Sequence, residues 1–266
     1  MIIESPTPKM LAEVRDGIAW ITFNAPEKRN AMSLEMWQGL GEILAKLEEE
    51  SSVRVLILKG AGDIAFVSGA DISEFEEKRS NQKDRDAYEA AFDNALEELA
   101  NFSRPVVAMI RGFCIGGGLA IALNTDIRIA SENSKFGIPA AKLVLGYGFQ
   151  SVKTLESIVG PSSAKDILFT ARFLDESEAL RIGLINFVVS VETLERTVLE
   201  YADRIVANAP LTIRAVKATV GEVVKDPGQE NPTYIDEMVN NCFLSEDYQE
   251  GRKAFLEKRR PKFLGS

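Results

Sequence analysis

Two glycine-rich segments carry the strongest signal in this chain: Ile64-Ala65-Phe66-Val67-Ser68-Gly69-Ala70-Asp71-Ile72 and Ile115-Gly116-Gly117-Gly118-Leu119-Ala120. Each follows a strand-like apolar run, Val53–Leu58 or Val106–Ile110, and each leads into a stretch of helical character. Small residues at a strand-to-helix turn let a ligand approach the backbone and leave the first helical N–H groups unpaired. Two such turns aimed at one oxygen would form an oxyanion hole, which stabilises an enolate or tetrahedral oxyanion. Tight packing would explain either segment alone, but the pair favours a catalytic interpretation.

The composition is that of an ordinary globular protein, with 266 residues, 45% hydrophobic and 27% charged. This length can bury a large core in one or two domains. Lysine and arginine total 31 against 40 aspartates and glutamates, a net charge of −9. That balance argues against binding to nucleic acid or to an anionic membrane, because both partners are polyanions.

The chain contains no histidine, which excludes serine–histidine and cysteine–histidine nucleophiles and disfavours a zinc site. Its two cysteines, Cys114 and Cys242, provide neither a disulfide framework nor zinc-site spacing. Cys114 is best interpreted as a small core residue, since no activating partner exists. Acid–base chemistry must come from carboxylates, tyrosine, lysine or bound water, and we expect no metal. With no transmembrane run and no signal peptide, we expect a cytoplasmic protein.

Strand-like and helix-like runs alternate along the first two thirds of the chain. An Asp16-Gly17 turn predicts a hairpin, and strands joined by helices predict a largely parallel sheet. Strands are predicted at Met10–Val14, Ile18–Phe23, Val53–Lys59, Val106–Arg111, Asp126–Ala130 and Ile185–Val189, and helices at Ser33–Glu50, Tyr88–Phe102 and Gly118–Asn124. The first of these helices carries one apolar stripe, with Ser33 as its N-cap: Leu34, Trp37, Leu40, Ile43, Leu44 and Leu47.

The last third is predicted to be helical, over Val191–Ala207, Pro210–Lys225 and Tyr234–Lys258. The charged region Glu74–Asp86 lacks apolar spacing. It is interpreted either as a loop or helix near a ligand entrance or as a solvated surface.

Four segments in order resemble the crotonase superfamily, the enoyl-CoA hydratase/isomerase group. Besides the two glycine segments, Ile18–Ala31 is similar to the family's opening strand and turn. The fourth segment, Ser245–Arg259 with Pro261 and Phe263, is similar to its C-terminal signature. The resemblance implies an α/β fold, in which a crotonase-like spiral of ββα units (1–190) binds acyl-CoA. It also implies an all-helical region (191–266) that assembles homotrimers or dimers of trimers.

The resemblance also implies a set of site residues. The backbone N–H groups of Ser68 and Gly117 would bind the thioester carbonyl oxygen. The CoA part of the substrate, which takes the place of a separate cofactor, would contact Lys28, Arg29, Ala70, Asp71, Ile72, Phe255 and Lys258, the last two often from a neighbouring subunit. Lys28, Arg29 and Lys258 could each be an ordinary solvated surface charge instead. Phe255 could equally anchor the last helix in a core.

The chain departs from the family pattern at two catalytic positions. Hydratases of the family carry two glutamates that activate water, and the matching positions here are Ala120 and Ala140. General acid–base groups typically supply roughly 10²–10⁴-fold in rate. Their absence argues against ordinary enoyl-CoA hydration and weakens the reading as a single-base isomerase.

Tyr147 lies where members of the methylmalonyl-CoA-decarboxylase type carry an active-site tyrosine, although their histidine is replaced here by Ala70. Decarboxylation needs no strong base, and tyrosine could orient a carboxylate or pass a proton. Tyr147 could equally cap a pocket wall. Three functions therefore stay open: a lyase or isomerase of CoA thioesters without the glutamate pair, a decarboxylase using Tyr147, and an acyl-CoA-binding protein with little catalysis.

Overall fold

The computed structural model describes residues 1–71 and 82–266, and these form two sheets surrounded by helices. The larger sheet has the strand order β1 (Ile2–Ile3), β2 (Met10–Arg15), β3 (Ile18–Phe23), β4 (Val55–Gly60), β6 (Val106–Ile110), β8 (Ile127–Ser131) and β11 (Phe187–Val189). The smaller sheet has the order β10 (Leu174–Asp175), β9 (Lys135–Gly137), β7 (Phe113–Ile115) and β5 (Ala65–Val67).

The chain winds between the sheets in repeated ββα units. Strands β4, β6 and β8 enter the larger sheet, and each is followed by a short strand, β5, β7 or β9, of the smaller one. A helix comes next: α3 (Gln82–Asn101), α4 (Gly117–Leu123) or α5 (Phe149–Thr170). From β3 to β11 the larger sheet is parallel, as predicted. The three-residue strands of the smaller sheet were not predicted, because so short a run shows no periodicity.

The predicted hairpin is confirmed. Strands β2 and β3 pair antiparallel up to Arg15 and Ile18, and the turn residues Asp16 and Gly17 have φ of 51° and 80°. Two positive φ angles are typical of a type I′ turn, whose twist matches that of the flanking strands.

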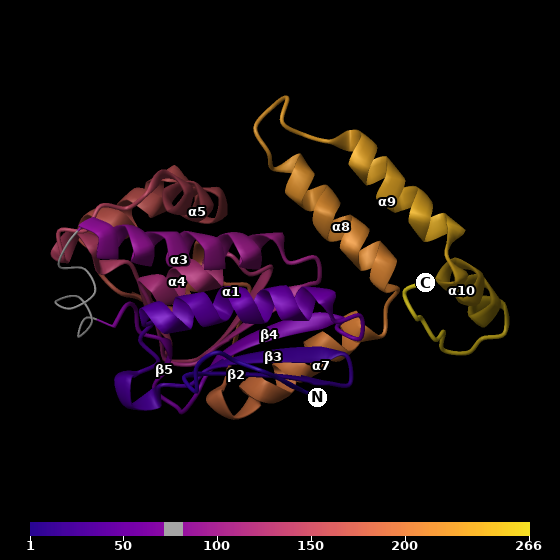
Figure 1. Ribbon diagram of the computed structural model, residues 1–266, viewed down its shortest axis with the longest axis horizontal. Helices are drawn as coiled ribbons and strands as arrows, with labels where there is room; N and C mark the ends of the chain where they lie inside the picture. The colour runs from indigo at the N-terminus through magenta and orange to yellow at the C-terminus, as the bar shows by residue number, and fades with distance from the viewer. Residues whose placement is uncertain (72–81) are drawn as a thin grey trace.

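Helix α1 (Leu34–Glu49) forms where the apolar stripe predicts it. Ser33 caps its first turn by accepting the N–H of Met36. Its buried face packs on one side of the larger sheet, while α7 (Leu194–Val206) packs on the other (Figure 1). Alternate residues of each central strand therefore enter two different cores, which explains their continuous apolar sequence.

One helix prediction was wrong, and one helix was missed. The predicted single helix Tyr234–Lys258 is two helices, α9 (Pro232–Leu244) and α10 (Glu246–Leu256), because Ser245 is extended and accepts the N–H of Tyr248 as a new cap. Helix α5 was not predicted at all. Its helical period is interrupted at Gly160, where φ is 74°, and at Pro161.

The remaining described helices are η1 (Pro26–Lys28), η3 (Pro139–Lys142), α6 (Glu176–Arg181), η4 (Val191–Thr193) and α8 (Pro210–Val223). Helices α8, α9 and α10 extend away from the sheets (Figure 1). The division into 1–190 and 191–266 stays a prediction, and α7 packs on the sheet formed by the first range. Of the region 74–86, residues 82–86 belong to α3 and the others lie outside the described residues.

Candidate active site

The two glycine-rich segments lie side by side. Strands β5 and β7 pair in parallel, so the turns that follow them leave the same edge of the smaller sheet. A methyl group placed on Gly116 would lie 3.7 Å from the Cα of Gly69, and one placed on Gly69 would lie 3.5 Å from the carbonyl oxygen of Ile115. The structure therefore brings the two turns into van der Waals contact.

Glycine is required where α4 crosses β5. A methyl group on Gly118 would lie 2.2 Å from the carbonyl oxygen of Val67, which no real side chain tolerates. Gly69 and Gly116 adopt φ of 118° and 53°, conformations that glycine reaches without steric cost. These three glycines let the helix start directly against the neighbouring strand.

The two candidate oxyanion donors differ in availability. Gly117 is the first residue of α4, and within the described chain its N–H has no recorded acceptor. The helix dipole there favours negative charge. The N–H of Ser68 donates to the carbonyl oxygen of Arg29 at 3.2 Å, at the long end for such a bond. A ligand oxygen would have to share or replace that bond, so Gly117 is the more accessible donor.

Trp37 forms a wall beside Gly117. Its Cζ2 would lie 3.1 Å from a methyl group on Gly117. The ring is fixed by a hydrogen bond from Nε1 to the hydroxyl of Tyr88, 2.8 Å long, and by edge contact with Phe92, with ring centroids 4.9 Å apart. The sequence identified Trp37 only as part of an apolar stripe. Its place at the site was missed because no local pattern links α1 to α4.

Lys28 and Asp71, two of the expected CoA contacts, pair with each other. The Nζ of Lys28 lies 2.6 Å from Oδ2 of Asp71, whose side chain is 7% exposed while that of Lys28 is 46% exposed. Ala70, beside Asp71, forms a parallel bridge with Met32. Ala70 and Asp71 thus lie on the turn that follows β5, and Lys28 reaches that turn from η1. Ile72, also expected there, lies outside the described residues.

Arg29 reaches the same turn through its backbone. It has φ of 54°, and its carbonyl oxygen accepts the N–H of Ser68. Its guanidinium lies 5.8 Å from the ring centroid of Phe113 on β7. This cation–π contact holds the charge close to both glycine turns.

Phe255 and Lys258 do not join the site within one chain. Phe255 is 84% exposed near the end of α10, and Lys258 follows that helix with φ of 54°. Helix α10 and strand β5 lie at opposite ends of the molecule (Figure 1). Within one chain, these two residues therefore lie away from the glycine turns.

The alanines at the expected glutamate positions contact the core. Ala120, in α4, is 4% exposed, and Ala140, in η3, packs against the same core. Cys114 is fully buried, and burial raises the pKa of its thiol. This agrees with its interpretation as a core residue.

Tyr147 carries an unsatisfied hydroxyl. It lies between η3 and α5 and packs against the main core, and its buried Oη has no hydrogen-bond partner in the described structure. Burial raises the pKa of Tyr147 to about 12, so the phenol is neutral at physiological pH. A neutral buried phenol can still donate one hydrogen bond.

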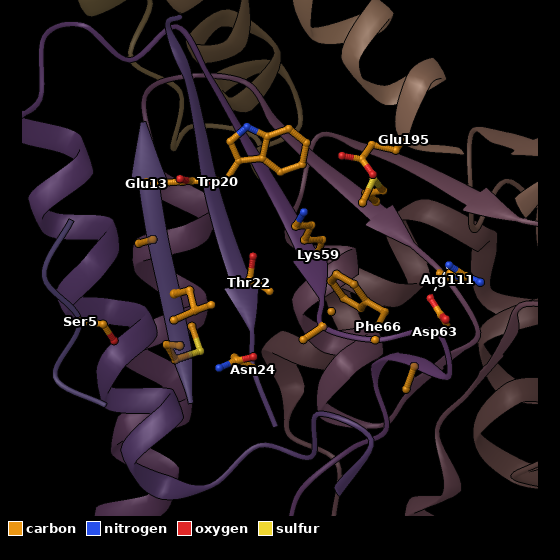
Figure 2. A pocket seen from close by; sticks show the side chains of 18 of the residues that line it. Ser5, Glu13, Trp20, Thr22, Asn24, Lys59, Asp63, Phe66, Arg111 and Glu195 are labelled. Atoms are coloured by element: carbon orange, nitrogen blue, oxygen red, sulfur yellow. Dashed lines mark ion pairs between the residues drawn. The ribbon is translucent and has the colours of Figure 1, made fainter. Parts of the chain in front are cut away.

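A large hollow in the described part of the chain lies elsewhere. It measures about 1030 Å³ and is lined mainly by β1, β2 and β3, with Lys59, Asp63 and Arg111. Figure 2 shows Arg111 paired with Asp63, and the Nζ of Lys59 lies 4.8 Å from the ring centroid of Trp20. Of the expected site residues that the structure describes, none lines it. Its size therefore does not identify it as the active site.

The family pattern of enoyl-CoA hydratase/isomerase matches residues 13–266. The chain belongs to this family. It is 35% identical over 251 residues to a short-chain-enoyl-CoA hydratase of Clostridium acetobutylicum, covering 94% of this chain and 95% of that one. It is 33% identical over 255 residues to a crotonyl-CoA hydratase of Syntrophomonas wolfei, covering 96% and 97%.

Solved structures of the family share the fold. An enoyl-CoA hydratase/carnithine racemase from Magnetospirillum magneticum superposes with a TM-score of 0.93 at 35% identity, covering 98% of this chain and 97% of that one. The predicted crotonase-like α/β fold is thus confirmed. Among residues 1–71 and 82–266, no helix combines the length and apolarity needed to cross a membrane. The same residues contain no group of three or more potential metal ligands.

We expect Tyr147→Phe to raise the free energy of unfolding at pH 7 by about 1 kcal/mol, because it removes an unsatisfied buried hydroxyl. The unfolded phenol ionises near pH 10, whereas the folded one holds its proton to about 12. The parent protein should therefore lose stability as pH rises from 10 to 12, and the variant should lose less. Denaturant unfolding at pH 7 and 11 measures both effects, with the exposed Tyr234→Phe as control. Destabilisation by Tyr147→Phe at pH 7 would show that the hydroxyl has an acceptor.

Proposed function

We propose that this protein is an enzyme that processes acyl-CoA thioesters and stabilises a thioester enolate with the N–H groups of Gly117 and Ser68. The observation that carries the proposal is the contact between the two glycine turns, with the Gly117 amide at the start of α4 donating to no acceptor among the described residues. Family membership supports the CoA thioester as the substrate class.

The chemistry follows from where the charge develops. When the α-carbon loses a proton or a substituent, the electron pair of the broken bond is delocalised onto the carbonyl oxygen of the thioester. Two fixed N–H donors in a site shielded by Trp37 stabilise that oxygen more than water does, because they need no reorientation. The hydrogen bond from the Ser68 N–H to the Arg29 carbonyl oxygen would lengthen as the oxyanion forms, whereas the Gly117 N–H donates to the oxyanion without giving up another acceptor.

The first candidate reaction is that of a lyase or isomerase that does not use two glutamates. The relatives described above are named as hydratases. The methyl groups of Ala120, which is buried, and Ala140, which is partly buried, supply no acid or base for activating water. We therefore propose that any hydration is slow, and that the acyl chain lies against apolar surface.

A decarboxylase is the second candidate, and the unsatisfied hydroxyl of Tyr147 favours it. In such a reaction the bond between the α-carbon and a carboxylate breaks, CO₂ leaves, and the electron pair becomes an enolate held by the oxyanion hole. A proton from solvent water then adds to the α-carbon, and the hydroxide left behind is neutralised by the solvent. Tyr147 would donate a hydrogen bond to the departing carboxylate, a role that its neutral state allows.

The third candidate is a binding protein with little catalysis, which would directly explain the alanines at the two expected glutamate positions.

For CoA, we propose that Lys28, Arg29, Ala70, Asp71 and Ile72 line the path of pantetheine and adenine. Lys28 and Arg29 supply cations close to the glycine turns, which suits the phosphates of a trianionic or tetraanionic ligand. The cytoplasmic location, and the expectation of no separate cofactor, nucleic acid or membrane partner, stay predictions.

Gly117→Pro tests the oxyanion hole. Proline is tolerated at the first position of a helix, but it removes the N–H. We expect kcat to fall about 10²–10³-fold relative to Gly117→Ala, which adds the same Cβ beside Trp37 and keeps the N–H. Single-turnover assays of both variants, with circular dichroism to confirm folding, measure the difference. Equal rates for the two variants would remove Gly117 from the mechanism.

A panel of enoyl-, malonyl- and 3-oxoacyl-CoA thioesters tests the reaction. We expect crotonyl-CoA hydration far below hundreds per second, the fast end of ordinary turnover. We expect a faster reaction on another member of the panel, with release of CO₂ if the substrate is a malonyl-type thioester. Rapid crotonyl-CoA hydration would contradict the interpretation of Ala120 and Ala140. Binding without turnover of any thioester would favour the third candidate.

Finally, we propose homotrimers, singly or in pairs, in which Phe255 and Lys258 of one copy reach CoA on another. The exposed apolar side chains of α8–α10 support such an assembly, among them Val216, Val220, Val223, Phe243, Leu244 and Leu256.

Light scattering should give the mass of three or six chains. Lys258→Glu should raise KM about tenfold, the cost of one charge-assisted contact, with kcat unchanged. Lys165→Glu is the exposed control, and a monomer, or equal KM values, would contradict the shared site.

A further inference from the structure

Helices α8, α9 and α10 attach to the rest of the chain without joining its two large hydrophobic cores. Among the described residues, neither core on the larger sheet includes a member of these helices. Helix α8 packs along α9, and α10 follows α9 at the end of the molecule far from β5 (Figure 1). Polar contacts therefore have a large part in setting the direction in which this helical region points.

Helix α8 and the loop after it are anchored by two ion pairs. Lys217 of α8 places its Nζ 2.8 Å from Oδ2 of Asp126 and donates to the carbonyl oxygen of Arg104 at 2.9 Å. Beyond α8, Oδ2 of Asp226 lies 2.8 Å from Nζ of Lys153 on α5. These contacts fix α8, but none of them involves α9 or α10.

Arg54 connects the larger sheet to the last part of the chain. It lies directly before β4, and its Nη2 donates to the carbonyl oxygens of Phe263, at 3.3 Å, and Leu264, at 2.9 Å. Within the described structure, these are the hydrogen bonds recorded between the stretch 232–266 and the sheets. The placement of α10 relative to the sheets therefore depends on this one side chain and on the segment that it holds, 263–265.

Helix α10 holds the same peptide groups from the other side. Asp247, in its first turn, is 4% exposed. Its Oδ1 accepts the N–H of Leu264 at 2.7 Å, and its Oδ2 accepts the N–H of Gly265 at 2.8 Å. Two consecutive peptide groups thus have their carbonyl oxygens on a guanidinium and their N–H groups on a carboxylate. Such charge-assisted bonds are stronger than neutral ones and polarise one another, so Arg54 and Asp247 are coupled through the chain between them.

The residues before this segment are also bound to α10. The carboxylate of Glu250 accepts two hydrogen bonds from the guanidinium of Arg259, at 2.6 and 2.8 Å, and one from the N–H of Lys262 at 2.9 Å. The side-chain hydrogen bond from Arg259 lowers the pKa of Glu250 to about 2, so this carboxylate is ionised at physiological pH. Helix α10 and the segment that follows it therefore form one unit, which Arg54 fixes to the sheet.

We propose that Arg54 and Asp247, acting through the segment 263–265, form a clamp that sets the direction of α10 and thereby positions Phe255 and Lys258. Phe255 lies near the end of α10, about 12 Å along the helix from Asp247. A small change of tilt at the clamp is therefore amplified at Phe255. The inference rests on the proposed function, in which Phe255 and Lys258 reach CoA on another copy. Arg54 and Asp247 are then positioning residues, which touch no substrate.

Hydrogen exchange of the full-length protein without ligand tests the clamp. The amides of Leu264 and Gly265 should be protected in the parent protein. Arg54→Gln should speed their exchange about tenfold, because a weaker bond at the carbonyl end weakens the bond at the N–H end. Arg54→Lys, which keeps the charge, should have a smaller effect. Arg196→Gln, an exposed arginine on α7, is the control and should have none.

Rapid exchange of these two amides in the parent protein would overturn the clamp. Equal exchange rates in the parent and in Arg54→Gln would also overturn it, because they would show that the two ends of the peptide groups are not coupled.

Steady-state kinetics with an acyl-CoA thioester test the positioning role. Arg54→Gln and Asp247→Asn should each raise KM about tenfold with kcat unchanged, the effect expected for Lys258→Glu. In the Lys258→Glu background, Arg54→Gln should raise KM less than in the parent, because the contact that it positions is already lost. A fall in kcat, or full additivity of the two substitutions, would overturn the role. If Asp247→Asn does not fold, the half-exposed Arg54 still provides the test.

The measurements separate this inference from the proposed function. If the parent protein binds no acyl-CoA thioester, the proposed function and the positioning role both fail, while the exchange rates still decide whether the clamp exists. If the parent protein turns over a thioester and Arg54→Gln leaves KM unchanged, the positioning role alone fails.

Discussion

The close approach of α4 to β5 is the constraint on which the site depends. Gly118 lets the helix backbone lie against the carbonyl oxygen of Val67, at a distance where any side chain would collide. Parallel pairing of β5 with β7 then brings the two glycine turns to one edge of the smaller sheet. Without this contact, the amides of Ser68 and Gly117 would belong to unrelated surfaces.

A second contact positions the turn that carries the expected CoA residues. The buried side chain of Asn30 accepts the N–H of Ala25 and donates to the carbonyl oxygens of Ala61 and Ala65. It therefore ties the turn after β3 to the start of β5. Because Asn30 has φ of 56°, its side chain also supports a left-handed backbone that most residues avoid. This amide therefore helps to hold Lys28 and Arg29 beside the glycine turns, together with the bond from Ser68 N–H to the Arg29 carbonyl oxygen and the pairing of Lys28 with Asp71.

Around the two glycine turns, the described side chains provide apolar walls and few groups that can act as an acid or a base. Trp37 is fixed by Tyr88, and Ala120 and Ala140 present methyl groups. Tyr147 brings a neutral hydroxyl that has no acceptor among the residues the structure describes. In such a setting, main-chain N–H groups provide most of the polarity directed at a ligand. This accords with a reaction whose main demand is stabilisation of negative charge on oxygen.

The sequence alone determined the features that depend on neighbouring residues. The Asp16-Gly17 turn, the Ser33 cap and the apolar stripe of α1 all follow from local conformation and periodicity, and the structure confirms them. The motifs also indicated the family, because backbone requirements for glycine are written directly in the order of residues.

Tertiary structure alone decided the features that join distant segments. Trp37 lies beside Gly117, and Asn30 binds Ala65, through contacts that no local period encodes. The long α5 escaped prediction because Gly160 interrupts its period, and the break at Ser245 was hidden inside a continuous helical pattern. Burial explains the remainder, since whether the hydroxyl of Tyr147 finds an acceptor depends on packing around it and not on its neighbours in sequence.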